Sequence, residues 1–236
     1  MYQRLPYGRQ WARSTEELPI SQDSQPLSEV LRERARDAWD RALAHRFFAE
    51  AEAGTLDAGV FARYLEVERD FVGTAARSLG LAVASADTPV VRKRLAAGLR
   101  HLTDEQDRYF AEVTGEAAPG GPPPSDGLAA PLHRHFLACA RGGELSVMLG
   151  CMLGAEWLYL TWCTAAYPVP AGPDGLAEWV ALHVGGEFRE HVEWLRATVD
   201  SLEVDEAEEE RMLGAFRGTL LAEIPFHSAA YPARPA

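Results

Sequence analysis

An acidic residue, Glu156, lies in the middle of a stretch of sequence that is otherwise almost wholly apolar. Helical spacing places it among the core-type residues Leu145, Leu149, Met152, Tyr159 and Cys163. Burying a carboxylate is costly unless the group is paired or protonated. A buried carboxyl with a raised pKa can transfer protons as a general acid or base. The alternative is a structural hydrogen bond within the core.

Two further acids repeat this pattern. Glu68 lies among Phe61, Leu65 and Phe71, and Glu223 lies among Phe216, Leu220 and Phe226. Several carboxylates that converge in one core need a compensating cation. That cation could be a metal ion, a protonated heterocycle or a buried basic side chain, and each implies a different function.

A second group of acidic and imidazole side chains could also point inward. Glu105 and Glu112 lie two turns apart on one expected helix, and His183, Glu187 and His191 follow one face of another. A solvated helix face would explain the acids of these charge-rich stretches equally well, Glu190 included. The histidines would then be structural.

Composition and cysteine usage exclude several classes of protein. The net charge of −12 and pI near 5.0 argue against a nucleic-acid partner, which requires clustered Lys and Arg. Three cysteines without metal-ligand spacing predict no disulfide framework and favour a reducing cytoplasm. We expect no membrane span, because Glu156 interrupts the apolar run 145–163 at a cost of roughly 2.5–3.5 kcal/mol.

The elements that must position these acids are helices. Capping residues, apolar periodicity and Gly or Pro stops predict about seven, at 28–53, 57–85, 88–115, 128–141, 144–166, 174–201 and 205–230. The first is expected to begin at Ser28, and the third at Thr88 with Pro89 in its first turn. No strand pattern is present, so the prediction is an all-α bundle. We expect residues 1–25 to be a flexible leader before a single domain at 26–231, and the Pro/Gly linker at 119–127 to be a surface loop.

The order of several short motifs resembles the TenA/thiaminase II family. They are His45-Arg-Phe-Phe48, Gly54-Thr55-Leu56, Phe61-x-x-Tyr64-Leu65, Glu156-Trp157-Leu158-Tyr159 and Glu223-Ile-Pro-Phe226, and the likeness spans residues 28–231. The resemblance implies a haem-oxygenase-like helical fold, usually assembled as a homodimer or homotetramer. It also implies cleavage of a C–N bond beside an aminopyrimidine ring, in salvage of thiamin breakdown products, without a cofactor.

The resemblance also implies roles for individual residues. Ala155 occupies the position of the family's nucleophilic cysteine, whereas Glu156, three residues before Tyr159, matches a type of TenA that carries a glutamate there. Cys151, one turn before Ala155, is more typical of packing than of a nucleophile. Glu156 and Glu223 are therefore the expected catalytic residues.

The same comparison predicts the residues that bind the pyrimidine-like substrate. Glu68 takes the place of the family's ring-anchoring aspartate and Phe71 that of a tyrosine, while His183 replaces a pocket aromatic residue. Phe71 and Phe226 would supply stacking surface, with Tyr159 beside them. A carboxylate can hold the ring's amidine edge through charge-assisted hydrogen bonds.

Two other functions are compatible with the sequence. The haem-oxygenase-like fold also occurs in di-iron oxidases, and an iron or manganese site could use Glu105, Glu112, Glu156, His183, Glu187 and either Glu190 or His191. Here His191 stands one residue later than that pattern requires. A third possibility is a small-molecule binder that keeps the acidic and aromatic residues but catalyses nothing.

Overall fold

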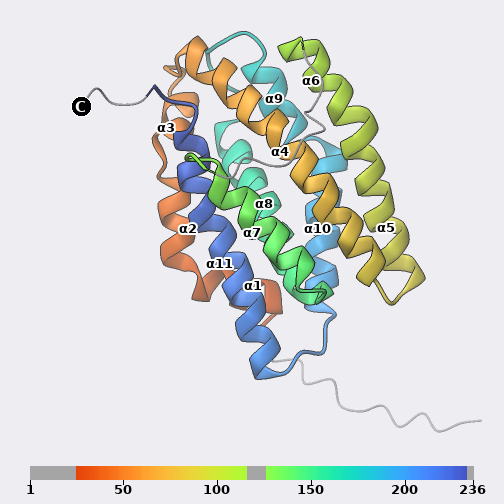
Figure 1. Cartoon of the computed structure of the whole chain (residues 1–236). Helices are drawn as coiled ribbons and strands as arrows, with labels where there is room; N and C mark the ends of the chain where they lie inside the picture. Colours follow the sequence, from red (N-terminus) through yellow and green to blue (C-terminus); the bar gives the residue numbers. More distant parts are fainter. Residues whose placement is uncertain (1–24, 116–125, 233–236) are drawn as a thin grey trace, which may run out of the picture.

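The computed structural model describes residues 25–115 and 126–232, and within these ranges the chain is helical without a strand (Figure 1). The first helices are α1 (Leu27–Arg34), α2 (Arg36–Leu43), α3 (Arg46–Glu52), α4 (Ala58–Ser85), α5 (Pro89–Arg100), the π-helical segment η1 (His101–Gln106) and α6 (Asp107–Thr114). The others are α7 (Ala130–Arg141), α8 (Leu145–Ala166), α9 (Leu176–Leu182), α10 (Gly186–Asp200) and α11 (Glu206–Ser228). Residues 1–24 of the expected leader and most of the Pro/Gly linker lie outside the described residues.

The predicted all-α class is confirmed, but the first predicted helix is divided into three. Its expected cap, Ser28, instead lies inside α1, where its backbone N–H donates to Asp200 Oδ1 at 2.8 Å. The chain breaks again at His45, whose Nδ1 accepts the Phe47 N–H at 3.2 Å and so caps α3. A side chain that satisfies the backbone locally competes with a continuous helix. Thr88 does cap α5, as predicted.

The third predicted helix continues through η1, so α5, η1 and α6 form one long rod at the edge of the molecule (Figure 1). A π-helix contains more residues per turn than an α-helix and rotates the residues that follow it. Glu105, within η1, and Glu112, in α6, are both exposed. Of the two directions that the sequence left open, inward or towards solvent, the structure shows the solvated one for both residues.

The sixth predicted helix is also interrupted. α9 ends at Leu182 and α10 begins at Gly186, after a turn that contains Gly185. Adjacent glycines favour such a break because they lack a helix-stabilising side chain. His183 consequently belongs to the end of α9, whereas Glu187 and His191 belong to α10, so these three residues do not share one helical face.

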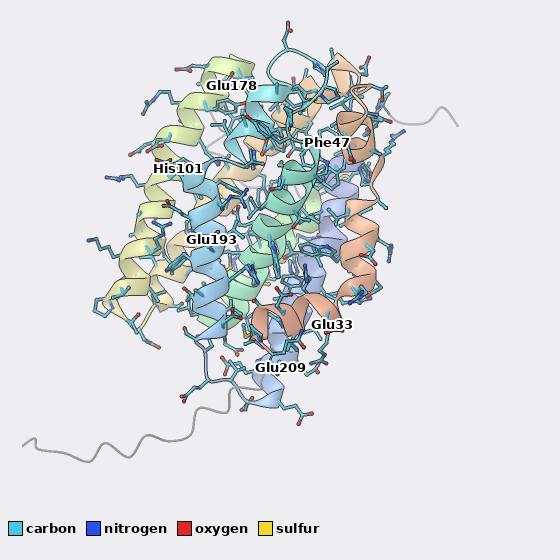
Figure 2. The ribbon with its side chains drawn as sticks, turned by 180° about the vertical axis from the view of Figure 1, so that it is seen from behind. Glu33, Phe47, His101, Glu178, Glu193 and Glu209 are labelled. Carbon is cyan, nitrogen blue, oxygen red and sulfur yellow. The ribbon has the colours of Figure 1, made fainter. Side chains whose placement is uncertain are left out.

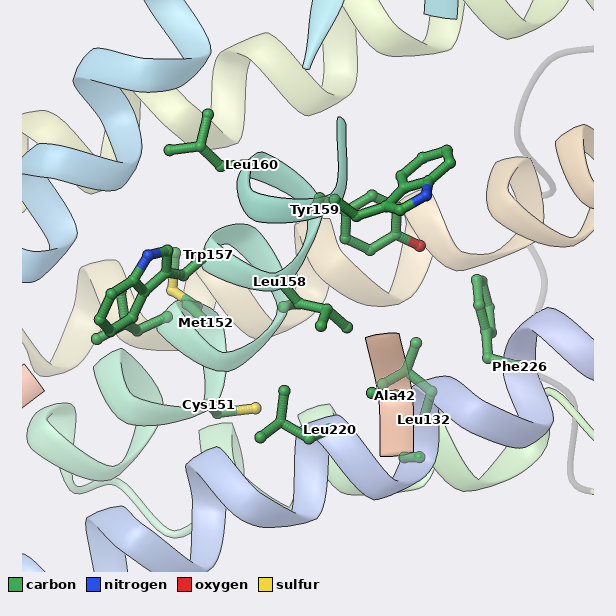
Figure 3. Packing of buried hydrophobic residues seen from close by; sticks show 14 of the residues in the cluster. Ala42, Leu132, Cys151, Met152, Trp157, Leu158, Tyr159, Leu160, Leu220 and Phe226 are labelled. Carbon is green, nitrogen blue, oxygen red and sulfur yellow. The ribbon is translucent and has the colours of Figure 1, made fainter. Parts of the chain in front are cut away.

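The apolar helix α8 lies at the centre of the bundle, as the sequence predicts. It packs most extensively against α11 and also contacts α2, α3, α7, α9 and α10. By length and composition α8 alone among the described helices could cross a membrane, but 72% of its most apolar window is buried inside the protein. Figure 3 shows its residues Trp157 and Tyr159 leaving the helix on opposite sides, towards different neighbours.

Glycine allows the close contact between α8 and α11. A Cβ at Gly154 would lie 2.9 Å from the Phe216 carbonyl oxygen. We expect Gly154→Ala to lower the free energy of unfolding by about 1–3 kcal/mol, because overpacking outweighs the better helix propensity of alanine. Urea denaturation should measure the loss. Gly214→Ala on α11, which would meet nothing within 4 Å, is the control; equal stability of the two variants would contradict this account.

Candidate functional site

Three glutamates from three helices meet in the interior. Glu68 comes from α4, Glu156 from α8 and Glu223 from α11; the first two are half-buried and Glu223 is 2% exposed. Burial raises the pKa of Glu68 to about 8, that of Glu156 to about 7 and that of Glu223 to about 8. Negative charge on Glu156 contributes to the rise for both other acids, so the three form one electrostatic unit.

Glu68 is held by hydrogen bonds that favour its charged form. Trp179 Nε1 donates to Glu68 Oε2 at 2.9 Å, from α9 across to α4. A hydrogen bond from the Tyr64 hydroxyl adds to this effect, and both oppose the rise in pKa that burial causes. A carboxylate has about four lone-pair sites, so Glu68 can still accept further donors from a ligand.

A pair of tyrosines connects the glutamates. The Tyr64 and Tyr159 hydroxyl oxygens lie 3.0 Å apart in the core. Tyr159 Oη also lies 3.5 Å from Glu223 Oε2 and 3.3 Å from His227 Nε2. Burial raises the pKa of both tyrosines well above the ordinary range, so both are neutral and can pass hydrogen bonds between Glu68 and Glu223.

His227 acts as a neutral acceptor in this network. Its Nδ1 donates to the Glu223 carbonyl oxygen at 2.9 Å, which leaves Nε2 without a proton and able to accept from Tyr159. Burial lowers the pKa of His227 to about 3. Its Nδ1 also lies 3.5 Å from Glu223 Oε2, but this contact is no ion pair at neutral pH because both groups are then uncharged.

Aromatic rings surround the acids. Phe71 and Phe226 meet edge to face with ring centres 5.6 Å apart, and Phe226 is 1% exposed. His183 lies against Trp179 at 4.1 Å, and its Nδ1 donates to the Trp179 carbonyl oxygen at 2.8 Å. Burial lowers the pKa of His183 to about 4. A ring-sized ligand must part Phe71 from Phe226 to stack between them.

All seven residues predicted for the carboxylate site lie in this region of the interior: Glu68, Phe71, Glu156, Tyr159, His183, Glu223 and Phe226. Their roles in binding or catalysis remain predictions. Two surface hollows, of about 300 and 240 Å³, lie elsewhere. The larger is bordered by Trp157 and by Arg189 and Arg196 of α10, so neither hollow opens on the three acids.

The structure does not gather the ligands of the alternative metal site. Its carboxylates Glu105, Glu112, Glu187 and Glu190 are exposed. Glu105 pairs on the outer surface with His101, labelled in Figure 2, at 3.0 Å. His191 stacks on Trp194 of its own helix. The π-helical segment and the break before α10 give these side chains directions that an uninterrupted helix would not, so the residues do not fit an iron or manganese centre.

Sequence analysis missed three members of the site, Tyr64, Trp179 and His227. Each lies one helical turn from a predicted residue: Tyr64 before Glu68, Trp179 before His183, and His227 after Glu223. Residues four apart share a helix face, so this spacing was the available signal. It does not reveal which groups hydrogen-bond across helices.

The raised pKa values predict how stability depends on pH. The folded chain keeps protons on these three carboxyls that the unfolded chain loses above about pH 4.5, so their stabilising contribution is present below that pH. It disappears as the pH rises through about 7 to 8. Buried histidines act in the opposite sense, but that effect is complete by about pH 6.5.

We therefore expect Glu223→Gln to flatten the pH dependence of unfolding between pH 6.5 and 8. The free energy of unfolding should fall less steeply than in the wild type, by up to about 1.4 kcal/mol per pH unit. Urea denaturation at both pH values measures the difference. Glu206→Gln, at an exposed position on the same helix, should keep the wild-type slope; identical slopes in all three proteins would disprove a raised pKa at Glu223.

Comparison with solved structures identifies the fold of the chain. No family model matches the chain, and no curated protein matches it by sequence. Among solved structures, a TenA homologue from P. horikoshii OT3 superposes with a TM-score of 0.78 at 18% identity, over 87% of this chain and 98% of the other. A TenA homologue from Pyrococcus furiosus gives 0.76 at 23% identity, over 87% and 100%.

The chain has the TenA fold. This result confirms the helical architecture that the motifs predicted. A protein described as a TenA family transcription regulator from Silicibacter sp. TM1040 also superposes, with a TM-score of 0.76 at 18% identity over 87% of this chain and 97% of the other. A putative TenA-like thiaminase from Sulfolobus solfataricus gives 0.67 at 16%, over 86% and 94%. Proteins described by different functions thus share the TenA fold, and function has to be argued from the site.

Proposed function

We propose that this chain is a TenA-like hydrolase that cleaves the C–N bond beside an aminopyrimidine ring with carboxylates in place of a cysteine. The observation that carries the proposal is the meeting of Glu68, Glu156 and Glu223 in one interior site. Ala155, at the expected cysteine position, cannot act as a nucleophile. Glu156, the next residue along the chain, is then the reactive group available at that place in the site.

A protonated aminopyrimidine would supply the positive charge that clustered carboxylates need. Glu68 would accept two hydrogen bonds from the ring nitrogen and the exocyclic amine, in the charge-assisted geometry that a carboxylate favours. Trp179 and Tyr64 hold the Glu68 carboxylate in place through their donated hydrogen bonds. Phe71 and Phe226 would contact the faces of the ring. The same cation would favour ionisation of one neighbouring acid.

Glu156 and Glu223 would divide the proton transfers. With the lower pKa, Glu156 is the better base at neutral pH, and it would take a proton from water as the water oxygen bonds to the exocyclic methylene carbon. Glu223, which holds its proton to about pH 8, would donate that proton to the departing amine as the C–N bond breaks. After product release, the proton taken up by Glu156 and the proton given up by Glu223 exchange with solvent water, which restores the starting state of both acids.

The experiment is ammonia release from 4-amino-5-aminomethyl-2-methylpyrimidine by the full chain. We expect ammonia and hydroxymethylpyrimidine in equal amounts. The rate should be highest between pH 7 and 8, because the pKa of Glu156 is about 7 and that of Glu223 about 8. Glu66→Gln should retain this activity, because Glu66 is exposed two residues from Glu68. Saturable binding of the compound without product would instead indicate a binding protein and would overturn the hydrolase proposal.

A further inference from the structure

A second cluster of reactive side chains lies between α7 and α8, apart from the three acids. His135 and Cys139 are one turn apart on α7, and Cys151 faces them from α8. One ligand atom from each residue lies within 4.8 Å of the other two. Among the described residues this is the group of three or more His, Cys, Asp or Glu side chains that could hold one metal ion.

The cluster is accessible on one side and closed on the other. Cys151 is fully buried, whereas His135 and Cys139 are half-buried, so an ion could enter from the α7 side. Cys139 Sγ lies 3.7 Å from His135 Nε2. Figure 3 shows the Cys151 sulfur directed towards Leu220 of α11, whereas the Tyr159 hydroxyl group lies on the side of Phe226.

Neighbouring groups on α11 orient two of the three candidate ligands. Thr219 Oγ1 lies 3.3 Å from Cys151 Sγ and can donate to it, and His135 Nε2 donates to the Ala215 carbonyl oxygen at 2.8 Å. The imidazole packs against the backbone of α11 at Gly218, where a Cβ would overlap with His135 Cε1. Thr219 is an outer group of the kind that orients a metal-binding side chain, whereas the bond from His135 Nε2 to Ala215 must be released before that nitrogen can bind a metal.

We propose that Cys139, Cys151 and His135 bind a thiophilic d10 cation, Zn²⁺ or Cu⁺. Soft thiolates select these ions, and imidazole suits both. Zn²⁺ would complete a tetrahedron with water, whereas Cu⁺ is satisfied by the three protein ligands. Binding requires the ligand atoms to draw together to roughly 3.7 Å, as metal–sulfur distances of about 2.3 Å dictate.

Metal binding displaces the protons of both thiols. Each thiol loses its proton to solvent when its sulfur bonds to the metal, so one Zn²⁺ releases two protons and leaves a neutral site. His135 would bind through Nε2, whose proton moves to Nδ1. The Ala215 carbonyl oxygen then loses the imidazole donor. The Thr219 hydroxyl lies 3.1 Å from that oxygen and 3.3 Å from Cys151 Sγ, and it can donate its single proton to either one.

The test is equilibrium dialysis of the reduced, metal-free full chain, with Zn²⁺ in one arm and Cu⁺ under anaerobic conditions in the other. We expect one equivalent of at least one of the two ions per chain. Cys139→Ser and Cys151→Ser should each weaken binding at least about 10-fold, a loss that even outer-shell changes can cause. Cys163→Ser is the matched control, because Cys163 is a buried cysteine of α8 outside the cluster; it should bind like the wild type.

A measurement on the wild type keeps the proposal testable if a variant does not fold. Cd²⁺ titration should produce thiolate-to-metal charge-transfer absorption that saturates at one ion per chain, with proton release into a weak buffer. Substoichiometric uptake of both Zn²⁺ and Cu⁺ would overturn the proposal. Equal metal affinity of Cys139→Ser and Cys163→Ser would also overturn it. So would the finding that Cys139 and Cys151 form a disulfide in the isolated protein and that the protein, once reduced, binds neither ion.

Discussion

Glu156→Gln is expected to lower kcat for ammonia release by about 10²–10⁴-fold, the usual contribution of a positioned general base. Glutamine preserves the shape of the side chain but cannot take a proton from water. Because the substitution leaves Glu68 unchanged, KM should change much less than kcat. Steady-state kinetics at pH 7.5 measure both constants.

The fold of this variant can be checked independently. Removal of a buried ionisable carboxyl should leave the protein at least as stable at pH 8 as the wild type, because its burial raises the pKa to about 7. Loss of turnover with an intact thermal transition would therefore reflect chemistry. Glu66→Gln provides the exposed control. Wild-type turnover in Glu156→Gln would show that Glu156 is not the base.

Glu223→Gln is expected to cause a loss of similar size, about 10²–10⁴-fold in kcat, for a different reason. Glutamine cannot donate a proton to the departing amine. In the wild type the rate should rise as Glu156 loses its proton near pH 7 and fall as Glu223 loses its own near pH 8. The variant's residual rate should keep the rise and lose the fall.

The pH profile separates this role from a structural one. Glu206→Gln, exposed on the same helix, should reproduce the wild-type profile and rate. If Glu223→Gln retains the fall above pH 8, another group donates the proton. The Tyr159 hydroxyl oxygen lies 3.5 Å from Glu223 Oε2 and can only assist that acid. Tyr159→Phe should therefore lower the rate less than Glu223→Gln does.

The sequence was sufficient for those features of the fold that depend on local chemistry. Thr88 caps a helix with Pro89 in its first turn, and α8 is the apolar core helix, as its composition predicts. The breaks at His45 and Gly185 and the π-helical segment at 101–106 were not predicted. The cap at His45 and the adjacent glycines 185 and 186 are local features, whereas the π-helical segment contains neither Gly nor Pro to indicate it.

The location of the site followed from residues that break the apolar pattern. Glu68, Glu156 and Glu223 each stand in a stripe of core residues, so helical spacing alone predicted that they point inward. The contact of Trp179 with Glu68 joins residues 111 positions apart and could not be inferred from spacing. For the same reason, the proximity of Cys139 to Cys151 was missed, because each lies on its own helix.

The ligands of the alternative metal site are dispersed for a common reason. The inward direction of Glu105 and Glu112 assumed an uninterrupted α-helix, and so did the shared face of His183 and Glu187. The π-helical segment and the Gly-Gly turn each change the direction in which the side chains of the following helix point. A set of metal ligands inferred from spacing along an assumed continuous helix is therefore less reliable than one acid within an apolar stripe.

The most direct test of the central claim is titration of the glutamate carboxyl groups by NMR, with isotope-labelled carboxyl carbons. The claim is that three glutamates form one interior site whose protonation changes near neutrality. We predict three carboxyl signals that titrate between about pH 7 and 8, assigned by their loss in Glu68→Gln, Glu156→Gln and Glu223→Gln. Titration of all glutamates near their ordinary pKa of about 4.5 would contradict it.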